Sequence, residues 1–200
     1  RILYRGKLLT EQLKCQLRGR EISFIPQSVN YLDPLMPVGR QVQIGLPKHD
    51  ARKMQRQLFE QYSLRENDGR LFPYELSGGM LRRVLFATSV RDGIRLVIPD
   101  EPTPGIHPQA LSEILKQLKK FAANGAGVMM ITHDIMAALE IADQVCVIRD
   151  GKTVETAPVS YFSGAGEKLQ NEYTRRLWRA LPQNDFDMEF QRKEDIMPCL

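Results

Sequence analysis

Two adjacent carboxylates, Asp100 and Glu101, follow directly after the apolar run 96–99, and Pro102 comes directly after them. A short continuous apolar run is typical of a strand buried in a parallel sheet, and a proline ends the pairing of such a strand. Ligands bind to open α/β sheets at the carboxyl ends of the strands, where carboxylates can hold Mg²⁺ or orient an attacking water. The pair therefore predicts a phosphoryl-transfer site, although an isolated Asp-Glu pair is more often a solvated surface feature.

A glycine-rich turn stands upstream of this pair, in the segment 76–80 (Leu-Ser-Gly-Gly-Met). Residues 81–91 after it carry a helical pattern of apolar side chains, which predicts a helix that starts at the turn. The free backbone N–H groups and the positive dipole end of a helix start suit a phosphate group. A lone Ser-Gly-Gly is usually an ordinary loop. A functional interpretation therefore depends on the order and spacing of this turn and the carboxylate pair.

Two more polar side chains stand at the ends of predicted strands. Gln27 follows the alternating pattern of 21–25 and opens a turn-rich segment over 28–39. His133 follows the apolar run 127–132. Imidazole can both donate and accept a hydrogen bond, which suits contact with a phosphate, but a single His beside a strand is more often structural. Neither residue indicates a function without its context.

The remaining pattern predicts an α/β fold. Apolar runs that alternate with helical periodicity predict parallel strands joined by helices, with 95–98, 127–132 and 144–149 as buried strands of one sheet. Asp150-Gly151 predicts a hairpin turn, and Thr10 is a suitable N-cap for a first helix. We expect further strands at 2–9, 21–25 and 152–155, and helices at 10–17, 38–44, 51–62, 79–91, 108–123 and 135–141. The buried side of helix 79–91 is expected to consist of Leu81, Val84, Leu85 and Thr88.

The turn at 76–80 and the carboxylate pair resemble, in type, order and spacing, the signature motif and the Walker B motif of ABC-transporter ATPases. The resemblance implies that Asp100 holds Mg²⁺ through water and that Glu101 is the general base for the hydrolytic water. It also implies that the turn contacts the γ-phosphate of an ATP held by an opposite subunit, so that hydrolysis needs a head-to-tail dimer. The turn residues that make this contact are expected to be Ser77, Gly78, Gly79 and Met80.

Gln27, His133 and His107 stand at the positions of three further motifs of that family. By resemblance, Gln27 belongs to the Q-loop and reaches Mg²⁺ and the attacking water, while the segment after it contacts the membrane subunit of a transporter. His133 belongs to the switch region and hydrogen-bonds the γ-phosphate. His107 lies in the D-loop, which couples the two ATP sites of a dimer. Asp is usual at that position and Ala is usual at Pro99, and these two departures leave the rate of hydrolysis open.

The fold implied by the resemblance is that of a P-loop NTPase, with a RecA-like parallel sheet, helices on both faces and an inserted ABC-type helical subdomain. We expect a remnant of the ATP-binding core at 1–34, the helical subdomain at 35–92, the catalytic core at 93–160 and a C-terminal helix and tail at 161–200. The sequence contains no G-x-x-x-x-G-K-[ST] phosphate loop, which in the family lies upstream of the Q-loop. We therefore interpret the chain as an N-terminally truncated part of a longer ATPase that by itself binds ATP weakly or not at all.

The segment 172–182 is similar to the C-terminal region of ATPases from oligopeptide, dipeptide and nickel importers. The resemblance thus implies an ATP-hydrolysing subunit of an ABC importer for peptides or for nickel and other metal chelates, with ATP and Mg²⁺ as cofactors. Its expected partners are a second ATPase subunit, transmembrane permease subunits and, indirectly, an extracytoplasmic substrate-binding protein. Two alternatives stay open: a partner subunit without a phosphate loop that donates only the Ser77 turn, and an ABC ATPase that acts on DNA or ribosomes.

Composition bears on whether the protein binds nucleic acid, binds a metal through cysteines or spans a membrane. A chain of 200 residues with 42% hydrophobic content can bury a core, and its net charge of +4 is too small to indicate a nucleic-acid partner. The three cysteines share no metal-binding spacing, and every apolar run is shorter than the ~18 residues that a membrane-spanning helix needs. We therefore expect no nucleic acid among the partners. The resemblance to ABC importers implies a peripheral position on the cytoplasmic face of the plasma (inner) membrane.

Overall fold

The computed structural model describes residues 1–89, 91, 93–103 and 108–182. His107 and the tail from residue 183 onward lie outside this description. The chain divides into two units, residues 1–134 and 135–200, and each is described by itself. The division into four functional segments stays a prediction. None of the helices in the described part of the chain is both long and apolar enough to cross a membrane.

A three-stranded parallel sheet forms the centre of the first unit. Its strands β3 (Ile22–Ile25), β4 (Leu96–Pro99) and β5 (Gly127–Val128) lie in the order β3-β4-β5, so the strand that precedes the carboxylate pair is the central one. Ile22 pairs with Leu96 and Leu96 with Gly127, which brings the carboxyl ends of all three strands to one edge. This parallel pairing with helical connections confirms the predicted fold class.

Two helices cover this sheet with their apolar sides. Helix α5 (Pro108–Ala123) joins β4 to β5 within the bounds that the sequence predicts, and buries Ile114, Leu115 and Leu118. Helix α4 (Gly78–Ser89) packs against β3. The predicted buried side of α4 is right for Val84 and Leu85 and wrong for two others, since Leu81 and Thr88 are only half-buried. Arg82, Phe86 and Ala87 are buried in their place, because α4 is covered on one side by β3 and on another by α2 and α3.

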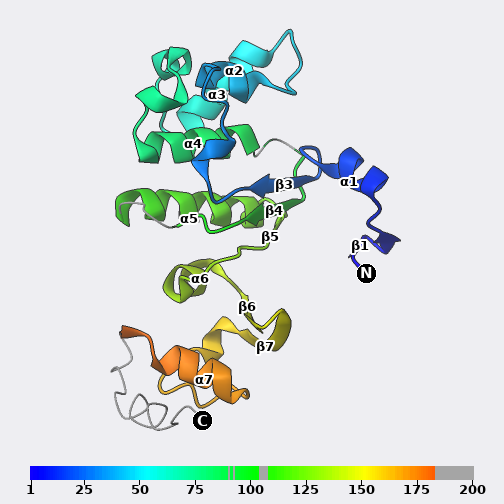
Figure 1. Cartoon of the computed structure of the whole chain (residues 1–200), viewed down its shortest axis with the longest axis vertical. Coiled ribbons are helices and arrows are strands. Elements are labelled where there is room, and N and C mark those ends of the chain that lie inside the picture. Colours follow the sequence, from blue (N-terminus) through cyan, green and yellow to red (C-terminus); the bar gives the residue numbers. More distant parts are fainter. Residues whose placement is uncertain (90, 92, 104–107, 183–200) are drawn as a thin grey trace, which may run out of the picture. The chain divides into compact units, whose positions relative to one another are not determined.

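The helical part of the first unit is built around α4. Helices α2 (Val38–Gln43) and α3 (Ala51–Gln61) pack against each other and against α4, as Figure 1 shows. Short 3₁₀ turns complete it at η1 (Val29–Tyr31), η2 (Glu66–Arg70) and η3 (Pro73–Glu75). Val38, Val42, Phe59 and Phe86 are almost completely buried and form its core.

The N-terminal segment folds locally. Strands β1 (Leu3–Tyr4) and β2 (Lys7–Leu8) form an antiparallel hairpin whose turn residues Arg5 and Gly6 have φ of 50° and 77°. Helix α1 (Glu11–Leu17) follows, and Thr10 caps it because its hydroxyl oxygen accepts a hydrogen bond from Leu13 N at 3.2 Å. The expected strand at 2–9 is therefore a hairpin, and the predicted N-cap is confirmed.

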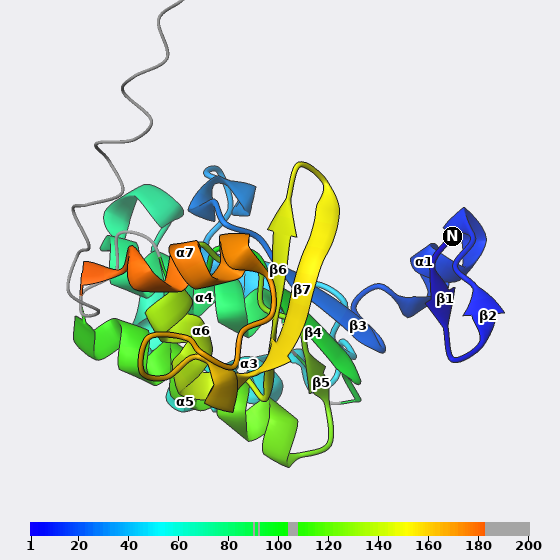
Figure 2. The same cartoon turned by 90° about the horizontal axis from the view of Figure 1, so that it is seen from below.

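The second unit is an antiparallel hairpin with two helices. Helix α6 (Ile135–Ile141) leads into β6 (Gln144–Arg149), which pairs with β7 (Lys152–Pro158) across the predicted Asp150-Gly151 turn. A 3₁₀ turn, η4 (Val159–Tyr161), and helix α7 (Glu172–Arg179) follow, and Figure 2 shows α7 close to the hairpin. The core of the second unit consists of Val147, Ala157, Phe162, Leu169 and Trp178.

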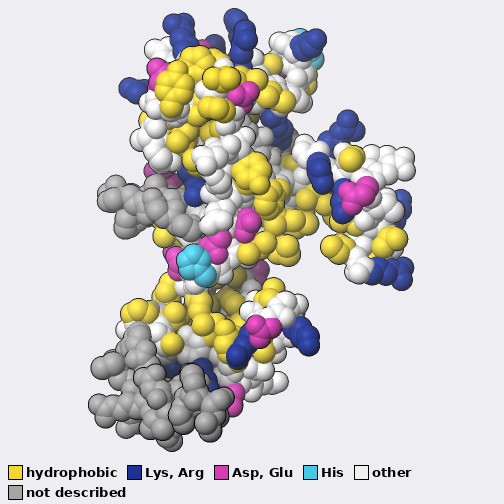
Figure 3. Space-filling model, in the orientation of Figure 1, with side chains coloured by type: hydrophobic (Ala, Val, Ile, Leu, Met, Phe, Trp, Pro, Cys, Tyr) yellow, Lys and Arg dark blue, Asp and Glu magenta, His cyan; other side chains and the backbone are white. Residues whose placement is uncertain are grey.

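Two strand predictions are wrong. Residues 144–149 were expected in the parallel sheet, but within the described residues β6 pairs only with β7, in antiparallel orientation. The run 127–132 was expected to be a buried strand, but β5 is short, and Met129 and Ile131 are 52% and 47% exposed. The reason is that β5 is an edge strand in the described sheet, so neighbours cover only part of its surface. Figure 3 shows hydrophobic side chains gathered over the strands of this sheet.

Candidate functional site

Asp100 and Glu101 lie at the carboxyl edge of the sheet, as predicted for a ligand site. Asp100 N donates to Ile25 O at the end of β3 (2.9 Å), and Glu101 N donates to Ile131 O beyond β5 (2.8 Å). Backbone pairing therefore continues past the end of β4, through Asp100 with β3 and through Glu101 with the segment after β5. These backbone hydrogen bonds hold both carboxylates between the two neighbouring strands.

The backbone of Glu101 adopts an unusual conformation. Its φ is 44°, in the left-handed region that residues with a side chain rarely occupy. Such a conformation costs of the order of 1 kcal/mol and persists only where surrounding contacts enforce it. At Glu101 the turn redirects the chain directly after the strand, and the side chain is only 16% exposed.

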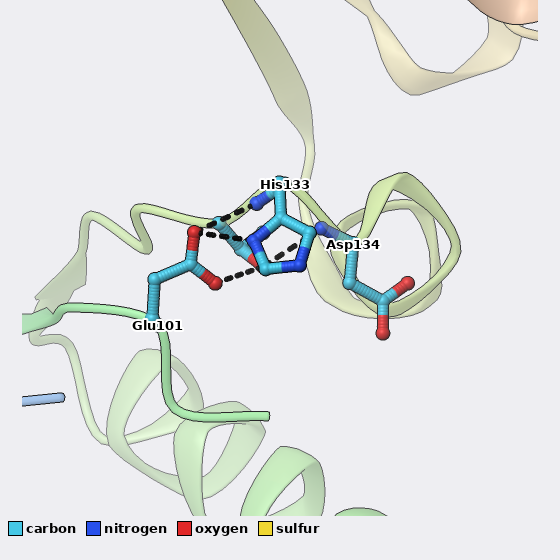
Figure 4. Close-up of polar contacts among 4 residues, drawn as sticks. Glu101, His133 and Asp134 are labelled. Atoms are coloured by element: carbon cyan, nitrogen blue, oxygen red, sulfur yellow. Dashed lines mark hydrogen bonds and ion pairs between the residues drawn. The ribbon is translucent and has the colours of Figure 1, made fainter. Parts of the chain in front are cut away.

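Both carboxylate oxygens of Glu101 accept hydrogen bonds, as Figure 4 shows. His133 N donates to Oε1 at 3.0 Å, and His133 Nδ1 lies 2.8 Å from the same oxygen. Thr132 Oγ1 donates to Oε2 at 3.2 Å and itself accepts from Asp134 N at 3.0 Å. The segment after β5 thus fixes the orientation of the carboxylate, and we refer to Glu101, Thr132 and His133 as the Glu101 cluster.

The Glu101 cluster favours a protonated imidazole. The hydrogen bond to Glu101 and the negative charge of its carboxylate raise the pKa of His133 above the ordinary histidine value. The His133 side chain is 78% exposed, so solvent and a ligand can both reach it. A carboxylate that accepts hydrogen bonds thus lies beside an imidazole that can donate to an oxygen of a bound anion.

The glycine turn is open to solvent. Ser77 Oγ accepts a hydrogen bond from Met80 N (3.3 Å) and caps α4, whose first residues are Gly78 and Gly79. Ser77 and Gly78 are exposed. A methyl group added at Gly78 or Gly79 would meet no atom within 4 Å, so a ligand can approach the backbone N–H groups of this helix start.

Gln27 is exposed and follows β3 after Pro26. Its carbonyl oxygen accepts a hydrogen bond from Arg82 Nη1 at 2.8 Å, which ties the end of β3 to the first turns of α4. Sequence reasoning missed Arg82, because an arginine between apolar positions on a helix reads as a solvated side chain. Only the tertiary structure places it inside, where burial lowers the pKa of its guanidinium.

Hydrogen bonds connect predicted site residues in two places. The structure brings Glu101 and His133 into direct contact, and it links Gln27 to the helix that the Ser77 turn starts. His107 lies outside the described residues. No group of three or more His, Cys, Asp or Glu side chains suited to a metal ion occurs in the described ranges.

The chain is similar to known proteins in both sequence and fold. A family described as "AAA domain, putative AbiEii toxin, Type IV TA system" matches residues 15–140. The chain is 34% identical over 198 residues to "Peptidoglycan transport ATP-binding protein YejF" of Agrobacterium fabrum, covering 92% of this chain and 36% of that protein. It is 37% identical over 180 residues to "Oligopeptide transport ATP-binding protein OppD" of Lactococcus lactis subsp. cremoris, covering 83% of this chain and 51% of that protein.

Among solved structures, the fold is similar to the dimeric post-hydrolysis state of the ATP-binding cassette MJ0796 bound to ADP and Pi. The TM-score is 0.67 at 24% identity, over 77% of this chain and 69% of that one. This likeness concerns the fold. The chain spans 36% to 60% of the length of the first curated relatives that it matches.

Proposed function

We propose that this chain, which belongs to the AAA-type family of ATP-binding domains and has the fold of an ABC cassette, forms part of an ATP-hydrolysing subunit. The subunit that we propose is that of an importer. The cargo that we propose is a peptide, with nickel or another metal chelate as the second candidate. The names of the relatives, which concern peptidoglycan and oligopeptide transport, favour peptides.

The observation that carries the proposal is the fixed carboxylate of Glu101. A general base must stand at the reacting centre with a free lone pair and a defined orientation. Thr132 and His133 hold the two oxygens of Glu101 from one side, while the carboxylate remains 16% exposed at the sheet edge. We propose that Glu101 accepts the proton of the attacking water, and that His133 donates to an oxygen of the terminal phosphate.

The glycine turn supplies the second half of the proposed mechanism. The open backbone N–H groups at the start of α4 lie at the positive end of the helix dipole. We propose that Ser77, Gly78, Gly79 and Met80 contact the phosphates of an ATP held by a second ATPase subunit.

Asp100 and Gln27 fit the needs of Mg²⁺ at this edge. Mg²⁺ in phosphoryl-transfer sites keeps several waters and takes only one or two protein oxygens besides the phosphates. Asp100 supplies one carboxylate beside the end of β3, and Gln27 follows that strand with an exposed side chain. When bound, the ion would neutralise charge on the phosphates. The role of Asp100 and Gln27 would be to orient its water ligands.

Contact with transmembrane permease subunits is proposed for the segment that follows Gln27. Tyr31 and Leu35 are 73% and 85% exposed there, which is unusual for large apolar side chains. Docking through this surface would place the subunit on the cytoplasmic face of the membrane. An extracytoplasmic substrate-binding protein would then be an indirect partner.

The test uses Glu101→Gln in the protein encoded by the whole gene. We expect ATP hydrolysis to fall by about a hundredfold or more, since the general base is lost while shape is kept. ATP binding should persist, so an ATP-bound dimer should accumulate and appear by light scattering. The control is Glu113→Gln, which makes the same change at an exposed position of α5.

Normal turnover by Glu101→Gln would refute the role of Glu101 as base. The wild-type protein could instead hydrolyse ATP only after a second, different ATPase subunit is added. That result would favour the alternative in which this protein is a partner subunit that donates only its Ser77 turn.

A further inference from the structure

Helix α4 is attached to β3 and its continuation at both of its ends. Near the start of α4, Arg82 Nη1 donates to Gln27 O across 55 residues of sequence. At the end of α4, the carbonyl oxygen of Ser89 accepts from the hydroxyl of Ser23, across 66 residues. The two hydrogen bonds make α4 and the segment from Ser23 to Gln27 one mechanical unit, and each can be removed separately.

The Arg82 side chain is an unusual occupant of its position. The residue is only 7% exposed, and no carboxylate among the described residues lies within ion-pair distance. A buried guanidinium without a counter-charge is unfavourable unless strong hydrogen bonds offset its desolvation. The bond to Gln27 O is of the charge-assisted kind, which is stronger than a bond between neutral groups.

The neighbouring arginine shows that this contact is specific to Arg82. Arg83 donates to Gly79 O at 3.3 Å and to Ser63 O at 3.0 Å. Both acceptors belong to the helical part of the first unit, so Arg83 stabilises the turn and the loop beside it. Of these two adjacent arginines, only Arg82 reaches the end of β3.

The position of Arg82 on α4 determines which segment moves when its contact with Gln27 is displaced. Arg82 follows Gly78 and Gly79 by four and three residues, so it lies one helical turn from them on the same side of α4. A single turn of helix is stiff on this length scale. A displacement of Gln27 therefore moves the glycine turn, and a displacement of the turn moves Gln27.

We infer that Arg82 is a positioning residue that couples the Ser77–Gly79 turn to Gln27. The mechanical link stands on the hydrogen bond alone; its effect on ATP turnover rests on the proposed function. In the proposed dimer, the turn contacts the nucleotide of the partner while Gln27 faces the nucleotide of its own subunit. Arg82 then connects the two ATP sites through one side chain.

The first experiment measures backbone amide exchange in the 200-residue chain. Arg82→Met keeps the length of the side chain and removes the donor. We expect amides of residues 27–32 and 78–82 to exchange about tenfold faster, which is the size expected for one lost charge-assisted hydrogen bond. Arg82→Lys, which retains one donor and the charge, should restore most of the protection.

Ser23→Ala is the matched control, since it removes the hydrogen bond at the other end of α4. It should accelerate exchange near Ser89 and leave the Gln27 segment unchanged. Equal acceleration throughout the first unit in Arg82→Met would show a merely structural role and would overturn the inference. Unchanged exchange at Gln27 would overturn it as well.

The second experiment measures ATP hydrolysis by the product of the whole gene. Arg82→Met should lower kcat about tenfold and change KM for ATP less than twofold, because the phosphate-binding groups themselves are intact; Arg82→Lys should recover kcat. A rise in KM with unchanged kcat would contradict the coupling. If the wild-type protein hydrolyses no ATP under any condition, the proposed function fails, and the exchange experiment alone decides whether Arg82 links the two segments.

Discussion

Gly39 and Gly79 form a natural pair for testing which glycines serve the fold and which serve a ligand. Each is the second residue of its helix, in α2 and α4 respectively. Neither has a positive φ, so alanine can adopt the backbone conformation at both positions. The two sites differ in the space around them. We predict opposite effects of Gly→Ala on stability.

The surroundings of the missing methyl group set the magnitudes. At Gly39 the Cβ would lie 2.8 Å from Gln55 Nε2 and 2.8 Å from the carbonyl oxygen of Gly69, and that backbone atom cannot move aside easily. Overpacking of this kind costs about 1–3 kcal/mol. At Gly79 the Cβ would meet nothing within 4 Å, so only the better helix propensity of alanine acts, which is favourable by up to about 1 kcal/mol.

The assay is urea and thermal unfolding of the 200-residue chain, followed by circular dichroism. For a chain of this size, 1 kcal/mol corresponds to about 2–4 °C in Tm. We expect Gly39→Ala to lower Tm by a few degrees, and Gly79→Ala to leave it unchanged or raise it slightly. In the product of the whole gene, Gly79→Ala should nevertheless reduce ATP hydrolysis, since a methyl group would separate the backbone from the phosphate.

Two outcomes would contradict these predictions. If Gly79→Ala destabilises the chain as much as Gly39→Ala does, the glycine turn is needed by the fold, and its openness to a ligand would no longer explain the sequence. Full ATP hydrolysis by a stable Gly79→Ala variant would refute the ligand contact instead.

Three further predictions concern single side chains. NMR titration of His133 should give a pKa above 6.5, and Glu101→Gln should lower that pKa; an unshifted value would disprove the contact. The stabilisation that the Glu101–His133 pair provides is complete below pH 6.5 and is lost as pH rises through the raised pKa. Tyr62→Phe should raise the free energy of unfolding by about 1 kcal/mol, because the buried Tyr62 hydroxyl has no hydrogen-bond partner among the described residues; a loss of stability in urea unfolding would show a hidden partner. Burial alone would raise the pKa of Glu155, but backbone N–H groups at the start of α7 donate to its carboxylate, and the net effect is a lowered pKa. The second unit should therefore lose stability as pH falls from 4.5 through the lowered pKa, and Glu155→Gln should remove that dependence in acid unfolding.

Features that depend only on neighbours along the chain could be predicted from the sequence. The bounds of α5, the cap at Thr10 and the hairpin turn at Asp150-Gly151 were predictable, because helix periodicity, capping and turn chemistry are local. The fold class followed from the alternation of such elements. The position of Asp100 directly after a strand was predictable for the same reason.

Which distant segments meet depends on the packing of the whole unit. The pairing of β6 with β7 and the exposure of β5 depend on which strands lie alongside, and an apolar run has the same appearance in either case. The contact of Glu101 with His133 spans 32 residues, and that of Arg82 with Gln27 spans 55. Local periodicity determines the side of an element on which a residue lies, but the partner on that side comes from the packing of the whole unit. For this reason the carboxylate pair was visible in the sequence, while the arginine that ties the glycine turn to Gln27 was not.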